Sequence, residues 1–420
     1  MTASTTLSPT DVAALRDRVT GRVLARGDLP DGGPTAAEAV AAHSTLVAHD
    51  PDVAVLAETE ADVVEAVRFA AHHGLRVRSH ATGHGQSSPI TDGVVLGTSG
   101  LAGVEVDPAS RVAHIGAGTR WSAVVDAAAE HGLAPVTGSS TSVGVVGYTL
   151  GGGYGPLTRS HGLTSDRVRG FRVVLADGSV VEAGPDSEPD LFWALRGGKG
   201  GLGVVTRLDL ELVPLRTLYA GSLTFDAPHV EEVLRGWAAW TATAPDDVTT
   251  SVAVLALPDL PFVPEHLRGR TVLALRFAYP GDPAEGERLA APLRALAPAL
   301  ADTVGELPVT AVATIHADPE DAGPSWVYGA GLREVDGEFL DRFLAELGPG
   351  SGSPFVAAEL RHVGGAGARD VEGGSAAGGR TAGFLLSLVG VNPPRLPDMV
   401  AAAAAFAQWS PPGAAAGARR

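Results

Sequence analysis

The chain has no cysteine among its 420 residues. Disulfides, thiolate metal sites, iron–sulfur clusters and cysteine nucleophiles are therefore excluded. It also lacks long apolar runs, because glycine, proline or a charged residue interrupts each one before it reaches membrane-spanning length. Residues 1–12 lack the basic start and apolar core of a signal peptide. We therefore expect no membrane partner and a cytoplasmic location.

Positive charge is scarce as well. Lysine and arginine together number 31 against 48 aspartates and glutamates, which gives a formal net charge of −17. Because phosphate binding needs clustered basic residues, we expect no nucleic-acid partner. With 45% hydrophobic and 19% charged residues the chain is typical of globular proteins, and it is long enough for two or three domains.

A loop of small residues follows a short strand-like segment near residue 75. Leu75–Ser79 alternates as a strand and then gives way to a loop that presents His84 between Gly83 and Gly85. Glycines allow close approach of the backbone to a ligand, and a loop of exposed N–H groups favours an anion such as a pyrophosphate. A second small-residue loop, Gly138–Gly155, begins about 55 residues later.

Two other readings of these glycines and histidines stay open at this point. His84 could form only local hydrogen bonds, and His80 with His84 could suggest a metal site, although no carboxylate is close in sequence and no helix carries the spacing. We therefore predict no metal. The stretch Gly198–Gly203 matches G-x-G-x-x-G, the fingerprint of an NAD-dependent dehydrogenase, but that fingerprint needs a strand before it and a helix after it. The patterns predict the reverse order, with a helix before these glycines and a strand after them, which argues against this alternative.

The periodicities predict an α+β fold without the regular βαβ repeat of a doubly wound sheet. The predicted elements include a capped helix from Thr59 to Gly74, a type I′ hairpin at Phe171–Glu182 and a helix near Asp11–Leu24. Longer helices alternate with strands after residue 215. We expect an N-terminal helix and linker at 1–49, one domain at 50–214 with subdomains at about 50–102 and 103–214, a second domain at 215–400, and a low-complexity tail at 401–420.

Further motifs follow the two loops in a fixed order. They are Arg159–Asp166, the Asp177-Gly178 hairpin, Asp190-Leu-Phe-Trp-Ala-Leu-Arg-Gly-Gly198, Gly203-Val-Val-Thr206 and Glu359-Leu-Arg-His-Val-Gly-Gly-Ala366. In this order they resemble the FAD-linked oxidases of the p-cresol methylhydroxylase type, in particular the berberine-bridge-enzyme-like branch. The resemblance implies an FAD-binding domain of two α+β subdomains, followed by a substrate domain with an antiparallel sheet covered by helices.

The resemblance also implies the cofactor site. His84 takes the place of the histidine that is bonded covalently to the flavin, and Ser140 stands where some members carry a second, cysteinyl link. Single attachment through His84 is therefore expected. The positions that match the family's FAD-contacting residues are Ser79, His80, Ala81, Thr82, Gly83, His84, Gly85, Gly138, Ser139, Val143, Gly144, Gly147, Gly153, Gly203 and Val205.

The activity implied is oxidation of a hydroxyl- or amine-bearing carbon of a small molecule in secondary metabolism, with hydride transfer to FAD and dioxygen as acceptor. A base must take the substrate's proton. Only five tyrosines exist, and the candidate catalytic or pocket residues are Tyr154, Tyr279, Tyr328, Glu359 and Arg361.

The sequence departs from the family at both ends. Residues 27–48 lack the aromatic residues expected there, and the family's C-terminal segment with its Tyr-Asp-Pro-x-Asn motif has no counterpart before Arg420. The expectation is a chain without that segment, and a truncated or degenerate FAD-binding protein without turnover is the alternative.

Overall fold

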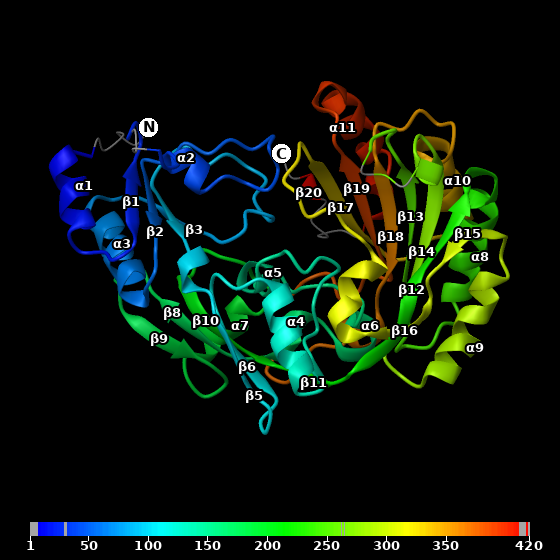
Figure 1. Ribbon diagram of the computed structural model, residues 1–420, viewed down its shortest axis with the longest axis horizontal. Helices are drawn as coiled ribbons and strands as arrows, with labels where there is room; N and C mark the ends of the chain where they lie inside the picture. Colours follow the sequence, from blue (N-terminus) through cyan, green and yellow to red (C-terminus); the bar gives the residue numbers. More distant parts are fainter. Residues whose placement is uncertain (1–6, 29–31, 262, 264, 411–416, 419–420) are drawn as a thin grey trace.

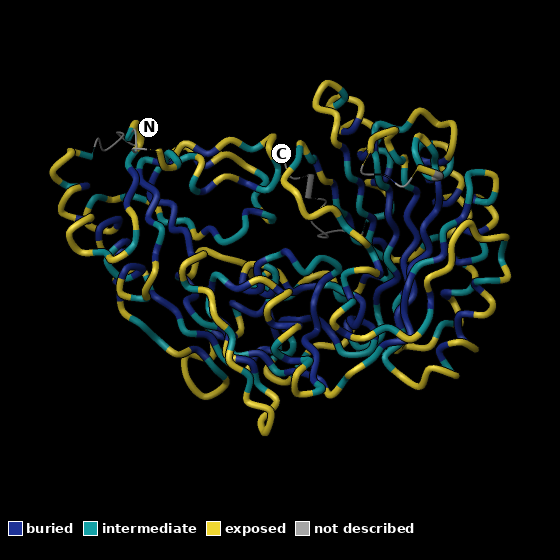
Figure 2. Tube along the Cα trace, viewed as in Figure 1, coloured by how far each residue is buried: buried dark blue, intermediate teal, exposed yellow. Residues whose placement is uncertain are grey.

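The computed structural model describes residues 7–28, 32–261, 263, 265–410 and 417–418. Its strands form three larger sheets and one two-stranded pair (Figure 1). The first two sheets lie in one half of the molecule and the third, largest sheet in the other half. The central strands of the sheets are mostly buried, and the edge strands, helices and loops around them carry most of the exposed residues (Figure 2).

The first sheet has the order β1-β2-β4-β3. Its strands are β1 (Arg22–Ala25), β2 (Val53–Leu56), β3 (Val77–His80) and β4 (Val94–Gly97), and its helices are α1 (Pro9–Arg16), α2 (Ala36–Ala39) and α3 (Glu60–His72). Strands β2, β4 and β3 are parallel, and β1 is antiparallel to β2. The predicted capping box of α3 is confirmed, since Thr59 and Asp62 bond each other's backbone N–H groups.

The helix predicted near Asp11–Leu24 is wrong in its second half. Helix α1 ends at Arg16, and the chain then forms β1, which pairs with β2. Val23 and Leu24 are both buried, on opposite faces of this sheet. Pairing with a neighbouring strand and burial on both faces outweigh the local helical pattern.

The second sheet is antiparallel and has the order β5-β6-β10-β8-β9. Its strands are β5 (Val104–Asp107), β6 (Val112–Gly116), β8 (Val168–Val174), β9 (Val180–Ala183) and β10 (Val204–Glu211). The helices of this region are α4 (Trp121–Glu130), α5 (Val145–Thr149), α6 (Thr158–His161) and α7 (Pro189–Leu195). Trp121 and Val124 of α4 pack on Ile115 and Leu208 of this sheet in one apolar cluster, and the short strands β7 (Leu133–Ala134) and β11 (Val213–Pro214) pair beside it.

The hairpin predicted at Phe171–Glu182 is confirmed, but its turn is not type I′. A type I′ turn needs positive φ at both central residues. Only Gly178 has it, at +79°, and the bonds Gly178 N to Leu175 O and Leu175 N to Ser179 O close a three-residue loop. Asp177 instead accepts from the N–H of Ser179, which favours an ordinary turn followed by a left-handed glycine.

The third sheet is antiparallel, with the order β15-β12-β14-β13-β18-β19-β17-β20 and with β16 also paired to β12. Its strands are β12 (Thr217–Asp226), β13 (Thr249–Ala256), β14 (Thr271–Tyr279), β15 (Ala299–Asp302), β16 (Gly305–Pro308), β17 (Trp326–Leu332), β18 (Ala357–His362), β19 (Phe384–Gly390) and β20 (Gly417–Ala418). One face packs against α8 (Val230–Thr241), α9 (Pro283–Arg294), α10 (Gly337–Leu347) and α11 (Leu396–Ala404).

The opposite face of this sheet carries polar residues. Because side chains alternate along a strand, Ala358 and Leu360 of β18 pack in the helix-covered core, whereas Glu359 and Arg361 point to the other face. Arg361, Ser251 and Arg276 are cross-strand neighbours there. The sequence of β18 thereby places charged groups on the sheet face that turns toward the first half of the molecule (Figure 1).

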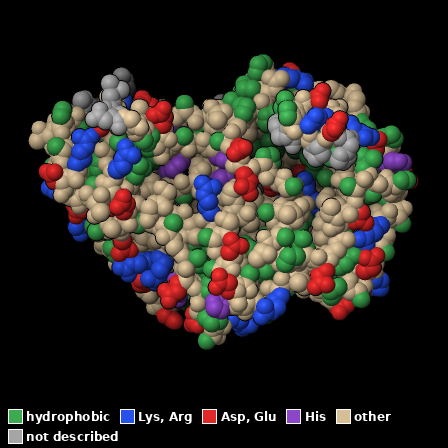
Figure 3. Space-filling view, in the orientation of Figure 1, with side chains coloured by type: hydrophobic (Ala, Val, Ile, Leu, Met, Phe, Trp, Pro, Cys, Tyr) green, Lys and Arg blue, Asp and Glu red, His purple; other side chains and the backbone are tan. Residues whose placement is uncertain are grey.

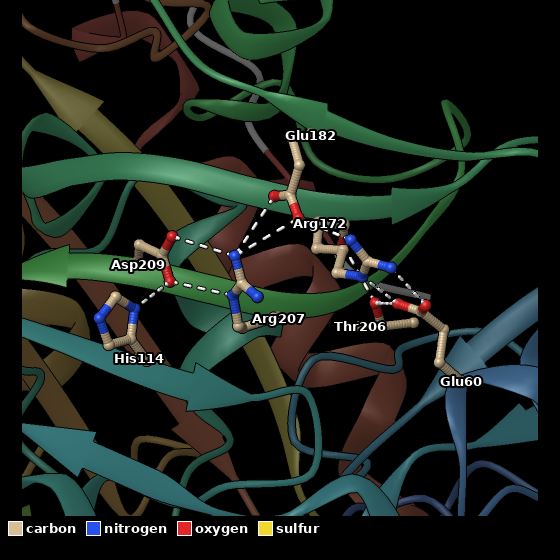
Figure 4. Close-up of polar contacts among 7 residues, drawn as sticks. All are labelled: Glu60, His114, Arg172, Glu182, Thr206, Arg207 and Asp209. Atoms are coloured by element: carbon tan, nitrogen blue, oxygen red, sulfur yellow. Dashed lines mark hydrogen bonds and ion pairs between the residues drawn. The ribbon is translucent and has the colours of Figure 1, made fainter.

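A network of charged side chains fastens α3 to the second sheet (Figure 4). Arg172 of β8 donates to both carboxylate oxygens of Glu60, at 2.7 and 2.9 Å, and the Thr206 hydroxyl donates to the same carboxylate at 2.7 Å. The pKa of Glu60 is lowered, and the hydrogen bond from Arg172 is the largest cause. The network holds the first turn of α3 in place, and with it the residues Val67 and Ala71 farther along that helix.

Two buried arginines connect the halves of the chain. Arg159 donates to the carbonyls of Pro245, Val248 and Val363, and Arg380 pairs with Asp166. The Arg380 and Asp166 side chains are 10% and 6% exposed. On the face seen in Figure 3, acidic and basic side chains are interspersed. Among the described residues no helix is both long and apolar enough to cross a membrane.

Candidate functional site

The first predicted loop begins after His80, the last residue of β3. Two neighbouring side chains, Thr82 and His43, hold the ring of His84 in place. The Nδ1 atom of His84 lies 2.9 Å from Thr82 Oγ1, and its ring stacks on that of His43 with 3.8 Å between the centroids. His43 comes from the N-terminal stretch and is fixed by a bond from its N–H to the carbonyl of Gly83. At Gly83, with φ of +73°, a side chain would meet the backbone of residues 41–43.

The second loop lies directly against the first. Thr82 Oγ1 accepts the N–H of Gly144 at 3.2 Å, and Ser142 Oγ lies 3.4 Å from Nε2 of His84. Ser140 bonds Ser142 at 2.9 Å. The two loops, 55 residues apart in the sequence, therefore form one site around the His84 ring.

His84 is a neutral imidazole at neutral pH. Burial, followed by the neighbouring His43 and Arg120, lowers its pKa to about 4. Arg120 is held beside the ring by a 2.8 Å bond to the carbonyl of Ser142. A neutral ring keeps a lone pair on one nitrogen, so His84 is poised to form a bond to carbon.

A cavity of about 840 Å³ extends from these loops between the first two sheets. Of the residues expected to contact FAD, it is lined by Ser79, Ala81, Gly147, Gly203 and Val205. Val67 and Ala71 of α3, Gln86, and the apolar residues Val174 and Leu175 complete much of its wall. This volume lies in the range of large ligand sites, and the glycines and small residues of its wall fit an extended dinucleotide.

The other expected FAD residues do not line this cavity. They are His80, Thr82, Gly83, His84, Gly85, Gly138, Ser139, Val143, Gly144 and Gly153. Thr82, His84 and Gly144 form the contact between the loops described above. His80 is bonded to Gln86, whose side chain also binds His49, so His80 supports the cavity wall from behind.

Gly138 and Gly153 lie on either side of Tyr148. A side chain at Gly138 would come within 2.9 Å of the Tyr148 ring, and one at Gly153 within 2.6 Å. The Tyr148 hydroxyl donates to the carbonyl of Tyr154 at 2.5 Å, and burial raises the pKa of this phenol. The lack of a side chain at Gly138 and Gly153 thus makes room for the Tyr148 ring as well as for a ligand.

The match to the nicotinamide fingerprint fails on secondary structure. Helix α7 precedes Gly198 and strand β10 follows Gly203, as the sequence patterns predict. No helix N-terminus therefore faces a phosphate at this glycine run. Gly203 instead takes a φ of +149° and lines the cavity.

A second polar cluster occupies the inner face of the third sheet. Glu359 accepts from Ser251 and Arg276, both at 2.9 Å, and from Arg361 at 2.8 Å. Burial by itself would raise the pKa of this carboxyl, but Arg361, His316 and Arg276 outweigh burial and hold the pKa well below its usual range. Glu359 is therefore ionised and bound by several donors.

This cluster borders a small cavity of about 20 Å³ between the two halves of the chain. Tyr154 and Gly155 line it from the second loop, and Arg361, His316 and His362 line it from the third sheet and the segment before β17. The second loop also contacts the segment that carries His316, because Ser139 donates to Asp318 at 2.7 Å.

The candidate catalytic residues fall in different places. Tyr154 and Arg361 line the small cavity and Glu359 lies just behind it. Tyr328 is 4% exposed and packs in the helix-covered core, and Tyr279 lies at the end of β14 outside the cavity lining.

Sequence reasoning missed His43, His316, Arg276 and Asp318. An aromatic residue was expected between residues 27 and 48, and the imidazole of His43 is the ring that stands over His84. No local pattern marks His316 or Arg276, because both contact Glu359 only in the folded chain, Arg276 across 83 residues and His316 from the segment before β17. Among the described residues no group of three or more potential ligands could hold a metal ion.

Known proteins resemble this chain most clearly over the first two sheets. Residues 51–184 match the family described as FAD binding domain. The (R)-6-hydroxynicotine oxidase of Paenarthrobacter nicotinovorans is 39% identical over 175 residues, which is 41% of this chain and 38% of that protein. The chain thus aligns with well under two thirds of this relative's length.

Solved structures share the fold over nearly the whole chain. The berberine-bridge-enzyme-like protein 1 of Physcomitrella patens is 18% identical with a TM-score of 0.80, over 95% of this chain and 89% of that one. The xylooligosaccharide oxidase of Myceliophthora thermophila in complex with xylobiose is 21% identical with a TM-score of 0.77, over 95% and 87%. Residues 51–184 are therefore an FAD-binding domain, and the chain has the α+β fold of the berberine-bridge-enzyme-like, p-cresol-methylhydroxylase-type FAD-linked oxidases.

Proposed function

We propose that this protein is an FAD-dependent oxidoreductase that oxidises a hydroxyl- or amine-bearing carbon of a small molecule, with dioxygen as the final acceptor. The observation that carries the proposal is the cavity of about 840 Å³ that leads to the two loops around His84. Residues 50–214 would hold the cofactor and residues 215–400 would supply the substrate side. Bound FAD supplies hydride acceptance and reoxidation by dioxygen.

His84 is the proposed point of covalent attachment. Its ring is fixed by the Thr82 hydroxyl and the stacked His43, and it carries no proton charge at neutral pH. Both conditions favour a nitrogen that bonds to carbon, because one nitrogen carries a lone pair without a proton and the ring orientation is set. With Ser140 in the second loop and no cysteine in the chain, His84 would be the only covalent link.

Acid precipitation of the purified protein tests the attachment. We expect yellow colour to stay with the precipitated wild type and to leave the pellet of His84→Ala. His131→Ala, which removes an exposed histidine at the end of α4, is the matched control and should keep its colour. Colour that washes out of the wild type would show a non-covalent FAD protein, and a protein that cannot be loaded with FAD would overturn the proposed function.

Oxygen consumption with two probes tests turnover. Xylobiose offers oxidisable hydroxyl groups, and (R)-6-hydroxynicotine offers an amine. We choose them because a xylooligosaccharide oxidase in complex with xylobiose and an (R)-6-hydroxynicotine oxidase are similar to this chain. We expect peroxide formation with a probe of the correct class. FAD that is bound but reduced by no alcohol or amine would favour the alternative of a binding protein without turnover.

A further inference from the structure

The small cavity on the inner face of the third sheet is lined by a buried imidazole, His316, whose Nδ1 has no hydrogen-bond partner. The short helical segment Val309–Ile315 ends immediately before His316 and directs this residue to the cavity wall. The side chain is 8% exposed, its Nε2 faces the carboxylate of Glu359, and its Nδ1 has no hydrogen-bond partner. A buried polar group without a partner is costly, so its presence at a cavity points to a group that arrives from outside.

Glu359 sets the orientation of this ring. Its Oε1 lies 3.5 Å from Nε2 of His316, within ion-pair range. An ionised carboxylate can only accept, so it favours the form of His316 that carries its hydrogen on Nε2. The lone pair is then on Nδ1.

The second histidine of the cavity is different. Nε2 of His362 accepts from Arg159 at 3.1 Å, because a guanidinium has only donors. Its lone pair is thereby used, and its hydrogen is on Nδ1. Of these two histidines, only His316 keeps a nitrogen that can accept a proton.

The other candidates are poor acceptors. Both oxygens of Glu359 already accept from Ser251, Arg276 or Arg361. Tyr154 is neutral, since burial raises the pKa of its phenol. A neutral phenol has no charge with which to draw a proton from an alcohol.

We propose that His316 accepts the proton of a substrate hydroxyl and that Glu359 is its positioning residue. The proposal rests on the proposed function and names the base and the substrate group for it. The H–C–O–H group of the substrate loses its hydroxyl proton to Nδ1 of His316 and its carbon-bound hydrogen, with the electron pair, to FAD. The product is a carbonyl, and two electrons pass on to dioxygen, which becomes hydrogen peroxide.

The cavity favours a hydroxyl over a charged amine. Its volume of about 20 Å³ suits one group the size of a water molecule. Arg276 and Arg361 share the single carboxylate of Glu359, and Asp318 lies near Arg361 without a bond to it. A substrate ammonium would therefore face two guanidinium groups at close range, whereas a neutral hydroxyl would not be repelled.

The ring must also be neutral at the working pH. Burial lowers the pKa of His316, Glu359 opposes this effect, and Arg361 and Arg276 add to it. The other titratable groups around the cluster are Arg361 on β18, Arg276 on β14, Tyr148 on α5 and Asp318. Because the cations outnumber the carboxylate beside the ring, we expect His316 to be uncharged at pH 7.

Nitrogen NMR of the histidine rings tests the proposal without substrate or cofactor turnover. In full-length protein labelled with ¹⁵N-histidine, the signal absent from His316→Gln identifies the residue. We expect a neutral ring with hydrogen on Nε2 at pH 7, and a change of tautomer balance in Glu359→Gln. A ring that is charged at pH 7, or that carries its hydrogen on Nδ1, would overturn the assignment.

Anaerobic flavin reduction by xylobiose is the second test. We expect His316→Gln to bind FAD as the wild type does but to be reduced on the order of 100-fold more slowly, with loss of the acidic limb of the pH profile. His114→Gln, in the outer network of Figure 4, is the control. Equal rates in His316→Gln and wild type, or reduction by (R)-6-hydroxynicotine alone, would overturn the proposal. Failure of the wild type to hold FAD would instead reject the proposed function.

Discussion

Burial, with nearby cations as a smaller effect, keeps buried histidines such as His84 and His362 neutral. His362 illustrates this at the scale of one residue. Burial, followed by Arg159, lowers its pKa to about 3 from 6.5. Between these two values the unfolded chain binds a proton that the folded chain does not bind. The free energy of unfolding therefore decreases as the pH falls from 6.5 toward 3.

We expect this loss to amount to at most about 1.4 kcal/mol per pH unit in the window from 6.5 down to 3. Urea unfolding at a series of pH values measures it. His362→Gln removes the titrating group and should flatten the curve relative to wild type, whereas His131→Gln, at an exposed position, should not. Parallel curves for wild type and His362→Gln would contradict the buried neutral state.

Residue types and their order predict more of the site than spacing alone. His84, Ser79, Ala81 and Gly203 are expected at the site because their loops resemble those of the family, and Ser79, Ala81 and Gly203 line the large cavity. His316 and Arg276 could not, since they become neighbours of Glu359 only through the pairing of β13, β14 and β18 and the packing of the segment before β17. Local sequence carries no information on such distant contacts.

At the scale of elements, the turn between α7 and β10 shapes one end of the large cavity. Gly203 has a φ of +149°, and a Cβ there would lie 2.6 Å from Val173 Cγ1 and 2.8 Å from the carbonyl of Val174. The backbone of this turn can pass close to β8 because residue 203 has no side chain. A larger residue there would push the turn into the cavity.

Gly203→Ala should therefore lower the free energy of unfolding by roughly 1–3 kcal/mol and weaken FAD retention. Gly103→Ala is the matched control, because this exposed glycine lies outside the cavity lining, nothing lies within 4 Å of its added Cβ and its φ is not positive. Chemical denaturation and FAD absorbance measure the two effects. Equal stability of the two variants would show that the turn can relax.

The same scale shows where pattern reading succeeds. Strongly periodic or capped elements such as α3 and the hairpin β8–β9 form as predicted. The errors occur where tertiary pairing decides, as in β1, or where turn geometry depends on one torsion, as at Gly178. The overall α+β class needed only the order of elements, and it is confirmed.

For the whole molecule, the contact between its halves depends on buried ion pairs. Asp166 lies in the short 3₁₀ helix Thr164–Arg167 after α6, and Arg380 comes from the segment before β19. Removing one partner of such a pair leaves the other charge buried, which typically reduces stability by about 3–5 kcal/mol.

Asp166→Asn should accordingly show a large decrease in the midpoint of thermal unfolding. Asp398→Asn breaks a pair with Arg395 in which both side chains are well exposed, and it should change the free energy of unfolding by less than about 1 kcal/mol. Calorimetry compares the two. Similar midpoints for both variants would mean that the Asp166 pair is solvated in the protein.

The sharing of Glu359 among Ser251, Arg276 and Arg361 also constrains how this protein can evolve. Replacing the carboxylate would leave two buried cations without a counterion, and replacing either arginine would alter the field at His316. A single substitution at any of these positions is thus harmful, although a combined one can preserve charge balance. New substrate preferences should therefore arise through simultaneous changes on β13, β14 and β18, and a mutational library that varies one position at a time would miss them.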